Sequence, residues 1–403
     1  MDNTKYFISL IFLIFLIITP IICNSNIKFL TKKRNLSEDS SSIKQEKTII
    51  IQEQPDNQDE INYQIYKELK KLEDEENKRK LERSKEQIKL TKKRWEKHQQ
   101  MKGNLKYRNN ALIIPCAYAL DNSYVYPTLV AMNSLAHNAG NNTFYSIYVL
   151  IGDDFTEENK KVIKSVEKNY TAHCEINFIL MGNKFKDEKT DERIKTPAYY
   201  RLELPALLPE IDRIIWMDGD TAVFEDLTPL MKLDMKGNYI MGFLDALPDA
   251  IDKFGIVNGT VLCSGVLLMD LNALRRDKMM EKFFKFMVEK KEEINQHDQT
   301  VINVVCQGKI APLPPKYGIW CFEQKKYLLK YNNRQRPHLK YNEEELIDAY
   351  FHPAILHYVW PKPYWKRKKP IFNKEWWDYA KSSGYFSGVY NKSPKYIKWG
   401  KPK

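Results

Sequence analysis

The pattern of apolar and polar positions divides this chain of 403 residues into stretches of different character. Residues 6–22 are almost all apolar, whereas residues 24–109 consist mainly of Lys, Glu, Gln, Asn and Ser. After residue 110, short apolar runs alternate with segments in which apolar residues recur every three or four positions. The runs are typical of buried strands, and the spaced segments are typical of amphipathic helices. The pattern therefore predicts an α/β domain that begins near residue 110.

Within this domain, strands and helices are expected in alternation. The apolar runs predict strands at residues 111–117, 144–151 and 176–181, with helices over residues 126–137 and from residue 156 between them. Such an order requires crossover connections, which are right-handed and give a mainly parallel sheet. The same reasoning places later elements at residues 198–208, 214–217, 261–271, 278–294 and 299–305. No dinucleotide-binding glycine fingerprint follows the first strand, which counts against a dehydrogenase.

The N-terminal apolar run directs the chain into the secretory pathway under either of two interpretations. Its 17 residues lie at the short end for a membrane span, and they also fit the core of a cleavable signal peptide. The sequence after residue 22 is a poor cleavage site, which favours an uncleaved signal anchor over residues 1–26. Lys5 on the short N-terminal side favours a lumenal body. Glycosylation sequons agree with secretory entry and lie at Asn35, Asn141, Asn169, Asn258 and Asn391.

The polar stretch at residues 27–109 is expected to form a charged stem, largely helical or disordered, rather than a domain with a core of its own. Three apolar residues there recur at a spacing of seven, as in a coiled-coil seam, but charged residues interrupt the pattern. The folded domain is assigned to residues 110–368. Residues 369–403 are a basic tail rich in aromatic residues.

Composition narrows the range of functions. A net charge of +12 and a pI near 9.1 suit attraction to nucleic acids, membranes or anionic sugar nucleotides. The basic residues cluster in the stem and the tail, as solvated segments do, and secretory entry argues against a nucleic-acid partner. Five cysteines follow Cys23 without close pairs, so no zinc-like spacing exists. One or two disulfides among them would leave at least one thiol unpaired.

Candidate chemistry appears where the apolar run at residues 214–217 ends in Asp218-Gly219-Asp220. Side chains two residues apart in an extended segment point the same way, so both carboxylates can face one cation. Hard oxygen ligands suit Mn²⁺ or Mg²⁺, and Gly219 leaves room for a ligand near the backbone. By itself, such a pair is more typical of a turn than of a metal site.

Further motifs follow the predicted elements in a fixed order. They are Ala119-Leu120-Asp121-Asn122-Ser123-Tyr124, Tyr199-Tyr200-Arg201-Leu202, Cys263-Ser264-Gly265-Val266-Leu267, Asp298-Gln299 and the closing segment from His357 to Trp365. Together with the acidic pair, this order over residues 112–365 resembles the family 8 glycosyltransferases. The resemblance implies a Rossmann-like, nucleotide-sugar-binding GT-A fold of the α/β class, with a mainly parallel mixed sheet. It also implies transfer of a hexose from a UDP-sugar with Mn²⁺, or with Mg²⁺ in its place.

The resemblance assigns a metal-binding role to three residues and a nucleotide-binding role to the turn after the first strand. The implied metal ligands are Asp218, Asp220 and His357. The implied uridine contacts are Ala119, Asp121 and Tyr124. An Asp carboxylate can accept the imide N–H of uracil, but Asp121 equally suits a cap for the helix that follows. Ser123 stands where many members of the family have Asn.

Contacts with the donor sugar and its diphosphate are implied for four further residues, namely Arg201, Ser264, Gly265 and Lys362. From its neighbours in the sequence, Arg201 also suits a surface ion pair with Glu203 or Asp212. Cys263 stands where the family has Asn, and a thiol is a weak hydrogen-bonding partner. This exchange predicts a donor preference different from that of the galactose-using members.

Catalytic roles are implied for Asp298 and Gln299 at the donor sugar, and for Asp245 near the acceptor. An amide oxygen is a weak nucleophile, so Gln299 is expected to stabilise an oxocarbenium-like centre rather than to attack it. Asp298 also suits the N-cap of the following helix. In the closing motif, Trp360 stands where Gly is usual, and Lys362 comes one residue early.

Taken together, the sequence and its resemblance predict a glycosyltransferase anchored in the Golgi membrane with a lumenal catalytic domain. The resemblance alone implies that this enzyme retains the anomeric configuration. It would move a hexose from a UDP-sugar to a glycan, glycoprotein or glycolipid. The alternative is a catalytically inactive module that binds a nucleotide sugar or a glycan, which the exchange at Cys263 and the irregular closing motif favour.

Overall fold

The computed structural model describes residues 71, 107–108, 111–188, 190, 195–246, 249–256, 259–335, 337–363 and 370–385. The chain divides into two compact units, residues 1–90 and 91–403, and every described residue except Lys71 belongs to the second. The expected anchor, nearly all of the expected stem and residues 386–403 of the tail lie outside the described residues. Among the residues that are described, no helix is long and apolar enough to cross a bilayer.

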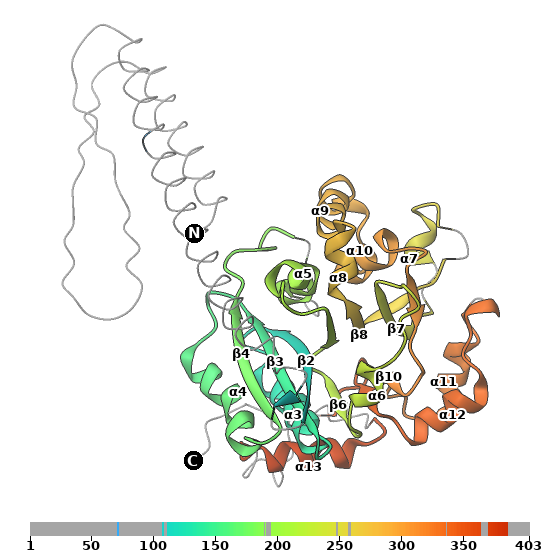
Figure 1. Ribbon diagram of the computed structural model, residues 1–403. Coiled ribbons are helices and arrows are strands. Elements are labelled where there is room, and N and C mark those ends of the chain that lie inside the picture. The colour runs from blue at the N-terminus through green and yellow to red at the C-terminus, as the bar shows by residue number, and fades with distance from the viewer. Residues whose placement is uncertain are drawn as a thin grey trace, which may run out of the picture. The chain divides into compact units, whose positions relative to one another are not determined.

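In the described part of the chain, an eight-stranded sheet forms the centre of the second unit (Figure 1). Its order is β4-β3-β2-β5-β8-β7-β9, with β1 paired to β2 beside this path. The strands are β1 (Tyr107–Arg108), β2 (Ala111–Leu120), β3 (Thr143–Ile151), β4 (Cys174–Leu180), β5 (Arg213–Met217), β7 (Ile240–Leu244), β8 (Leu262–Asp270) and β9 (Ile310–Pro312). Strands β4, β3, β2 and β5 are parallel, whereas β8 runs antiparallel to β5 and β7. The α/β class and the mainly parallel mixed sheet are confirmed.

The parallel half of the sheet follows the predicted pattern closely. Helices α3 (Val125–His137) and α4 (Glu157–Asn169) connect its first three strands, and they pack against each other. Helix α4 begins where the Thr156 hydroxyl accepts the N–H of Asn159 (3.2 Å), and its apolar stripe faces the core. Helix α13 (Asn373–Ser382) packs on α3 below the sheet in Figure 1. Nearly continuous burial of β3 is typical of a parallel strand covered on both faces.

Three later elements differ from their predicted bounds. The single helix expected at residues 198–208 is a 3₁₀ helix, η1 (Thr196–Glu203), followed by the short α5 (Leu204–Leu207). Pro205 explains the break, because its nitrogen has no hydrogen to donate within a continuous helix. The strand expected at residues 261–271 ends at Asp270, whose side chain accepts the N–H of Ala273 (2.8 Å) and caps the next helix.

The helix expected at residues 278–294 is shorter than predicted and ends at Glu289. The remaining helices, in chain order, are α6 (Thr228–Met231), α7 (Asp249–Asp252), α8 (Leu271–Arg276), α9 (Met279–Glu289), η2 (Lys291–Glu293), α10 (His297–Val305), α11 (Lys325–Asn332), η3 (Pro337–Leu339) and α12 (Glu343–Phe351). Helices α8, α9 and α10 lie together in Figure 1, with α11 and α12 apart from them.

A second, three-stranded sheet was not predicted. It has the order β10-β11-β6, formed by β10 (Tyr317–Trp320), β11 (Ile355–His357) and β6 (Thr221–Val223). Strand β6 follows β5 after only three residues, so the acidic pair lies between the two sheets. The pairing of β11 with β6 sets His357 opposite Thr221. This small sheet therefore brings the closing motif beside the acidic pair.

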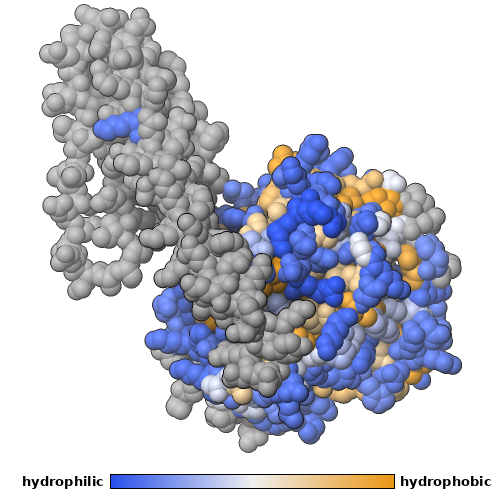
Figure 2. All heavy atoms as spheres, in the orientation of Figure 1, coloured by the Kyte–Doolittle hydropathy of each residue, from blue (hydrophilic) through white to orange (hydrophobic). Residues whose placement is uncertain are grey.

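The second unit has a core that includes its cysteines and a surface that is mainly hydrophilic on the face shown in Figure 2. All five cysteines after Cys23 are buried and none of them forms a disulfide, so the disulfides considered from the sequence do not occur. Cys116 and Cys263, which both lie in apolar runs of the sequence, are among the buried residues of this unit. On the face shown in Figure 2, hydrophilic residues cover most of the described surface, with apolar residues interspersed.

Candidate metal and nucleotide-sugar site

The acidic pair occupies a tight connection that both sheets hold in place. The Asp218 N–H donates to the carbonyl of Gly265 in β8 (2.7 Å), and the Tyr358 N–H donates to the carbonyl of Asp220 (2.9 Å). Gly219 between them has no room to spare, because a Cβ there would lie 2.1 Å from Thr128 Oγ1. The sequence predicted that Gly219 leaves room for a ligand near the backbone. In the structure, helix α3 occupies the space in which a side chain at residue 219 would lie.

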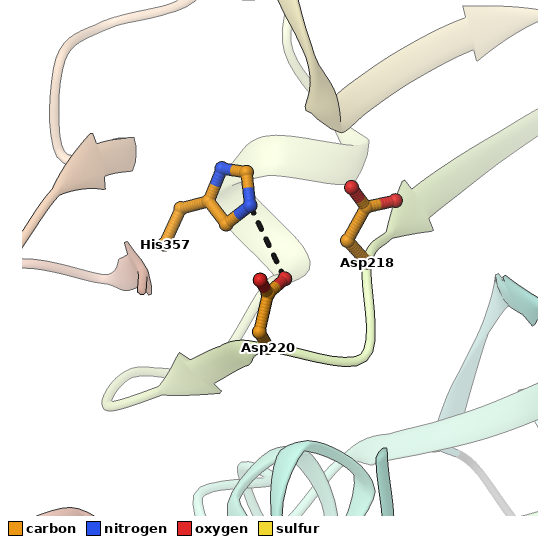
Figure 3. Close-up of side chains that lie close together, drawn as sticks. All are labelled: Asp218, Asp220 and His357. Atoms are coloured by element: carbon orange, nitrogen blue, oxygen red, sulfur yellow. Dashed lines mark ion pairs between the residues drawn. The ribbon is translucent and has the colours of Figure 1, made fainter. Parts of the chain in front are cut away.

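Asp218, Asp220 and His357 converge on one point. One ligand atom of each lies within 4.8 Å of the others, and His357 Nε2 is 3.2 Å from Asp220 Oδ1 (Figure 3). Asp218 and Asp220 lie in one short connection between β5 and β6, and the pairing of β11 with β6 brings the distant His357 beside them. Two carboxylates and an imidazole form a donor set that suits Mn²⁺, and Mg²⁺ through the oxygens. The structure thus brings together the three residues to which the resemblance assigns a metal-binding role.

In this cluster, the side chains of Asp220 and His357 are buried, and each favours its charged form. Burial alone raises the pKa of Asp220, but Lys362 and His357, which both contact its carboxylate, hold that pKa well below its usual range. Burial lowers the pKa of His357, yet the charge of Asp220 outweighs it and raises the pKa to about 10. His357 therefore carries a proton near neutral pH, and a cation that uses Nε2 must compete with that proton.

Two residues of the Cys263-Ser264-Gly265 segment position the imidazole. A Cβ at Gly265 would lie 2.0 Å from His357 Cε1, so the ring occupies the space that a side chain would need. The Cys263 thiol is 3.7 Å from His357 Nδ1. The close approach that Gly265 permits is thus made by His357 and not by a ligand. A contact between Gly265 and a donor sugar stays a prediction.

Arg201 is buried at the centre of the site, with its side chain only 3% exposed. It donates to Ala198 O through Nε (2.9 Å), to Ser264 O through Nη1 and to Asp218 Oδ1 through Nη2 (2.9 Å). Its guanidinium also lies 4.4 Å above the ring of Trp216. The surface ion pair with Glu203 or Asp212 considered from the sequence does not form. A direct contact with the donor stays a prediction.

Asp298 lies beside Arg201, and of its two sequence interpretations the structure contradicts the N-cap. It does not cap α10, which follows Gln296 as its N-cap residue. Its Oδ2 is 3.1 Å from Arg201 Nε but has no hydrogen-bond donor, although the carboxyl group is buried. Burial raises the pKa of Asp298, and Arg201 only partly offsets that effect. A buried carboxylate oxygen without a donor is costly in isolation, which fits a group that a ligand contacts.

Gln299 is held at both ends of its amide. Its Oε1 accepts the backbone N–H of Ser264 (3.1 Å), and its Nε2 donates to Asp245 Oδ2 (2.9 Å). Asp245 is 3% exposed and also accepts the hydroxyl of Tyr331 (2.5 Å). Burial raises the pKa of Asp245 above its ordinary value despite these bonds. The predicted catalytic residues Asp245 and Gln299 therefore touch each other, which no sequence spacing indicated.

The turn after β2 lies against the acidic connection. Asp121 Oδ1 accepts the N–H groups of Ser123 (2.8 Å) and Tyr124 (3.1 Å), so the carboxylate supports the start of α3. Tyr124 Cδ1 lies 3.0 Å from the position of a Cβ on Gly219. Ala119, at the end of β2, is partly buried. Contacts of Ala119, Asp121 and Tyr124 with a nucleotide stay predictions, but their turn adjoins the candidate metal ligands.

Two side chains of the site were missed by sequence reasoning. The Trp216 indole N–H donates to Asp218 Oδ1 (2.9 Å), and Tyr331 binds Asp245. Trp216 was assigned only to a buried strand, and Tyr331 lies in no motif. Trp216 lies only two residues before Asp218, but nothing in an apolar strand indicated that its indole would bond to that carboxylate. Tyr331 lies 86 positions from Asp245 and meets it only in the folded domain.

Known proteins resemble this chain over the same region. A sequence-family model, Glycosyl transferase family 8, matches residues 115–369, more than half of the chain. A putative glycosyltransferase of Haemophilus influenzae is 23% identical over 228 residues, which cover 55% of this chain and 64% of that protein. The chain thus spans less than two thirds of that relative's length. General stress protein A of Bacillus subtilis is 25% identical over 274 residues, covering 66% of this chain and 92% of that protein.

A similar fold occurs among solved structures. The crystal structure of the galactosyltransferase LgtC with donor and acceptor sugar analogues superposes with a TM-score of 0.58 at 22% identity. The match covers 67% of this chain and 96% of that one. At this identity, the likeness establishes the fold and leaves the substrates open.

Proposed function

The chain belongs to glycosyl transferase family 8 and is a glycosyltransferase of the GT-A fold, and we propose that it moves a hexose from a UDP-sugar to a glycan, glycoprotein or glycolipid with retention of configuration. The observation that carries this proposal is the convergence of Asp218, Asp220 and His357. Ligands of open α/β sheets bind outside the carboxyl ends of the strands, and this cluster adjoins the carboxyl end of β5.

The three converging residues would hold Mn²⁺ or Mg²⁺. Such a cation supplies positive charge next to the diphosphate that leaves with the nucleotide. His357 contributes only after it loses its proton, and Asp220 is already ionised because Lys362 and His357 lower its pKa. Lys362 brings a second positive charge to the same place, where an ammonium can contact a diphosphate oxygen as a point charge.

Around the cation ligands, Arg201 organises the acidic residues. It binds Asp218 and lies within 3.1 Å of Asp298 Oδ2, so it keeps two carboxylates close together that would otherwise repel each other. Asp298 Oδ2, which forms an ion pair with Arg201 but accepts no hydrogen bond, then suits a hydroxyl of the donor sugar as its hydrogen-bond donor. Ser264 is among the neighbours that lower the pKa of Asp298, against the larger effect of burial.

At the reacting carbon, Gln299 acts by electrostatics in this proposal. Its amide oxygen already accepts the Ser264 N–H and is intrinsically a weak nucleophile. A dipole held at both ends stabilises a developing positive centre without reorganising during the reaction. The acceptor hydroxyl attacks from the face that the diphosphate leaves, and a phosphate oxygen takes its proton. Asp245, which is bonded to Gln299, would contact the acceptor in this proposal.

Entry into the secretory pathway and residence in the Golgi membrane are part of the proposal. Residues 6–22 support a signal anchor by composition alone. Of the sequons that the structure describes, Asn141 and Asn169 are both exposed and therefore accessible to glycosylation.

A screen of UDP-hexoses with Mn²⁺ tests the proposed reaction. At least one of them is expected to release UDP without an acceptor, and NMR of the freshly released sugar should show the α-anomer. Release of the β-anomer would contradict retention. Tight UDP binding with no turnover of any sugar would favour the inactive binding module instead.

A further inference from the structure

Asp245 and Gln299 form a continuous hydrogen-bonded chain with Tyr331, a residue outside every motif. The Tyr331 hydroxyl donates to Asp245 Oδ1 (2.5 Å), and Gln299 Nε2 donates to Asp245 Oδ2 (2.9 Å). Gln299 Oε1 in turn accepts the Ser264 N–H (3.1 Å). Each carboxylate oxygen of Asp245 thus receives one of these donors, and the orientation of Gln299 depends on where Asp245 is held.

The direction of each bond in this chain follows from its chemistry. The Ala246 N–H donates to the Tyr331 hydroxyl oxygen (2.9 Å), so the hydroxyl proton remains for Asp245. Burial and the neighbouring Asp245 raise the pKa of Tyr331 far above its ordinary value, so the hydroxyl stays protonated. Because Asp245 is only 3% exposed, water is poorly placed to replace a lost donor.

Packing fixes the ring of Tyr331 to the small sheet. Its ring centroid lies 4.7 Å from that of Trp320 and 5.6 Å from that of Phe322. Trp320 ends β10 and pairs in register with His357 of β11. The tyrosine is therefore held by the same sheet that carries a candidate metal ligand, as is typical of residues that orient a site from outside.

We propose that Tyr331 is a positioning residue of the active site, which holds Asp245 and, through it, the Gln299 amide. The inference rests on the proposed glycosyl transfer, because it concerns the geometry of two residues assigned to that reaction. Loss of the hydroxyl leaves Asp245 Oδ1 without this donor and allows the carboxylate to rotate. The Gln299 amide then loses its fixed partner at Nε2.

The test compares Tyr331→Phe with Tyr341→Phe. The Tyr341 hydroxyl accepts the Leu244 N–H (3.0 Å) at the end of β7 and donates to Leu313 O (3.0 Å), so its removal also breaks two hydrogen bonds. Tyr341 has no carboxylate partner among these bonds, which makes it a matched control. For UDP-sugar hydrolysis, Tyr331→Phe should lower kcat about ten- to a hundredfold, the loss expected for a hydrogen bond to a charged acceptor. The KM for the UDP-sugar should stay within about threefold, because the substitution is expected to affect the transition state and not the binding of the UDP-sugar in the ground state.

Equal kcat values in the two variants would overturn the inference. Asp245→Asn gives a second test that survives a failure of Tyr331→Phe to fold. Wild-type kcat in Asp245→Asn would also overturn it, because Tyr331 acts only through that carboxylate. The double variant Tyr331→Phe/Asp245→Asn is expected to be no slower than Asp245→Asn alone. Failure of the wild type to hydrolyse any UDP-sugar would instead contradict the proposed function, so the two failures are distinguishable.

Discussion

His357 owes its place in the site to the missing side chain at Gly265. The imidazole fills the space in which a Cβ would lie, and Cys263 contacts its other nitrogen. The position of this candidate metal ligand therefore depends on a glycine in a neighbouring strand. The compact thiol of Cys263 packs beside the ring, 3.7 Å from Nδ1.

Gly265→Ala should displace His357 and weaken cation binding. Calorimetric titration with Mn²⁺ is expected to show an affinity at least about tenfold lower, and overpacking should lower the free energy of unfolding by about 1–3 kcal/mol. Gly308→Ala is the control, since Gly308 has a φ of 77° and nothing within 4 Å of an added Cβ. That variant bears backbone strain alone and should keep wild-type affinity. Unchanged Mn²⁺ affinity in Gly265→Ala would refute the steric argument.

Asp226 gives a pH-dependent prediction away from the site. Its carboxylate accepts the N–H groups of Gly140 (2.9 Å) and Thr228 (3.0 Å). Burial alone raises its pKa, but these bonds and others lower it overall. A lowered folded pKa means that the stabilisation is complete above the ordinary carboxyl pKa of about 4 and is lost as the pH falls through the folded value.

Asp226→Asn is therefore expected to be less stable than the wild type near neutral pH by about 1–2 kcal/mol, measured by urea unfolding. The difference should shrink below about pH 4, where the wild-type carboxylate gains its own proton. Asp348→Asn, at an exposed position in α12, should show no such trend. A difference that grows at acid pH would contradict the assignment.

At the scale of elements, the long buried strands were predictable and the short ones were not. Strand β3 carries apolar residues on both faces because helices or other elements cover each side, and that pattern is visible in one sequence. Strands β6, β10 and β11 have only three or four residues each, so no periodicity can develop. Their pairing depends on contacts between distant segments. For the same reason, the chain from Tyr331 to Gln299 was invisible in the sequence, whereas Asp218 and Asp220 were not.

Helix α13 lies beyond the region that the family model matches, yet it is part of the core. Trp376 is 1% exposed, and the helix packs on α3. Trp376→Ala should lower the free energy of unfolding by about 3–5 kcal/mol, as expected for a large buried side chain. Its half-buried neighbour Trp377, which donates to Pro363 O (3.3 Å), is the matched control and should cost clearly less. Equal losses in urea unfolding would show that α13 is only a loosely attached tail.

At the scale of the whole molecule, the proposed lumenal location has a direct consequence. Asn141 and Asn169 are exposed in the described domain, so both should carry glycans in a eukaryotic secretory system. Glycosidase treatment is expected to increase gel mobility, and Asn141→Gln and Asn169→Gln should each increase it in the untreated protein. Mobility that does not respond to the glycosidase would contradict secretory entry.

The central claim is that Asp218, Asp220 and His357 hold a cation that a UDP-sugar transferase needs. The most direct measurement is the rate of UDP release from the best donor as Mn²⁺ is titrated, for the wild type and Asp220→Asn. The wild-type rate should rise with Mn²⁺ and saturate, and Asp220→Asn should be slower by at least about a hundredfold, since even outer-shell partners of a metal are worth 10–100-fold. Asp348→Asn should match the wild type. A rate that does not depend on Mn²⁺ or Mg²⁺, or an Asp220→Asn variant with full activity, would contradict the account.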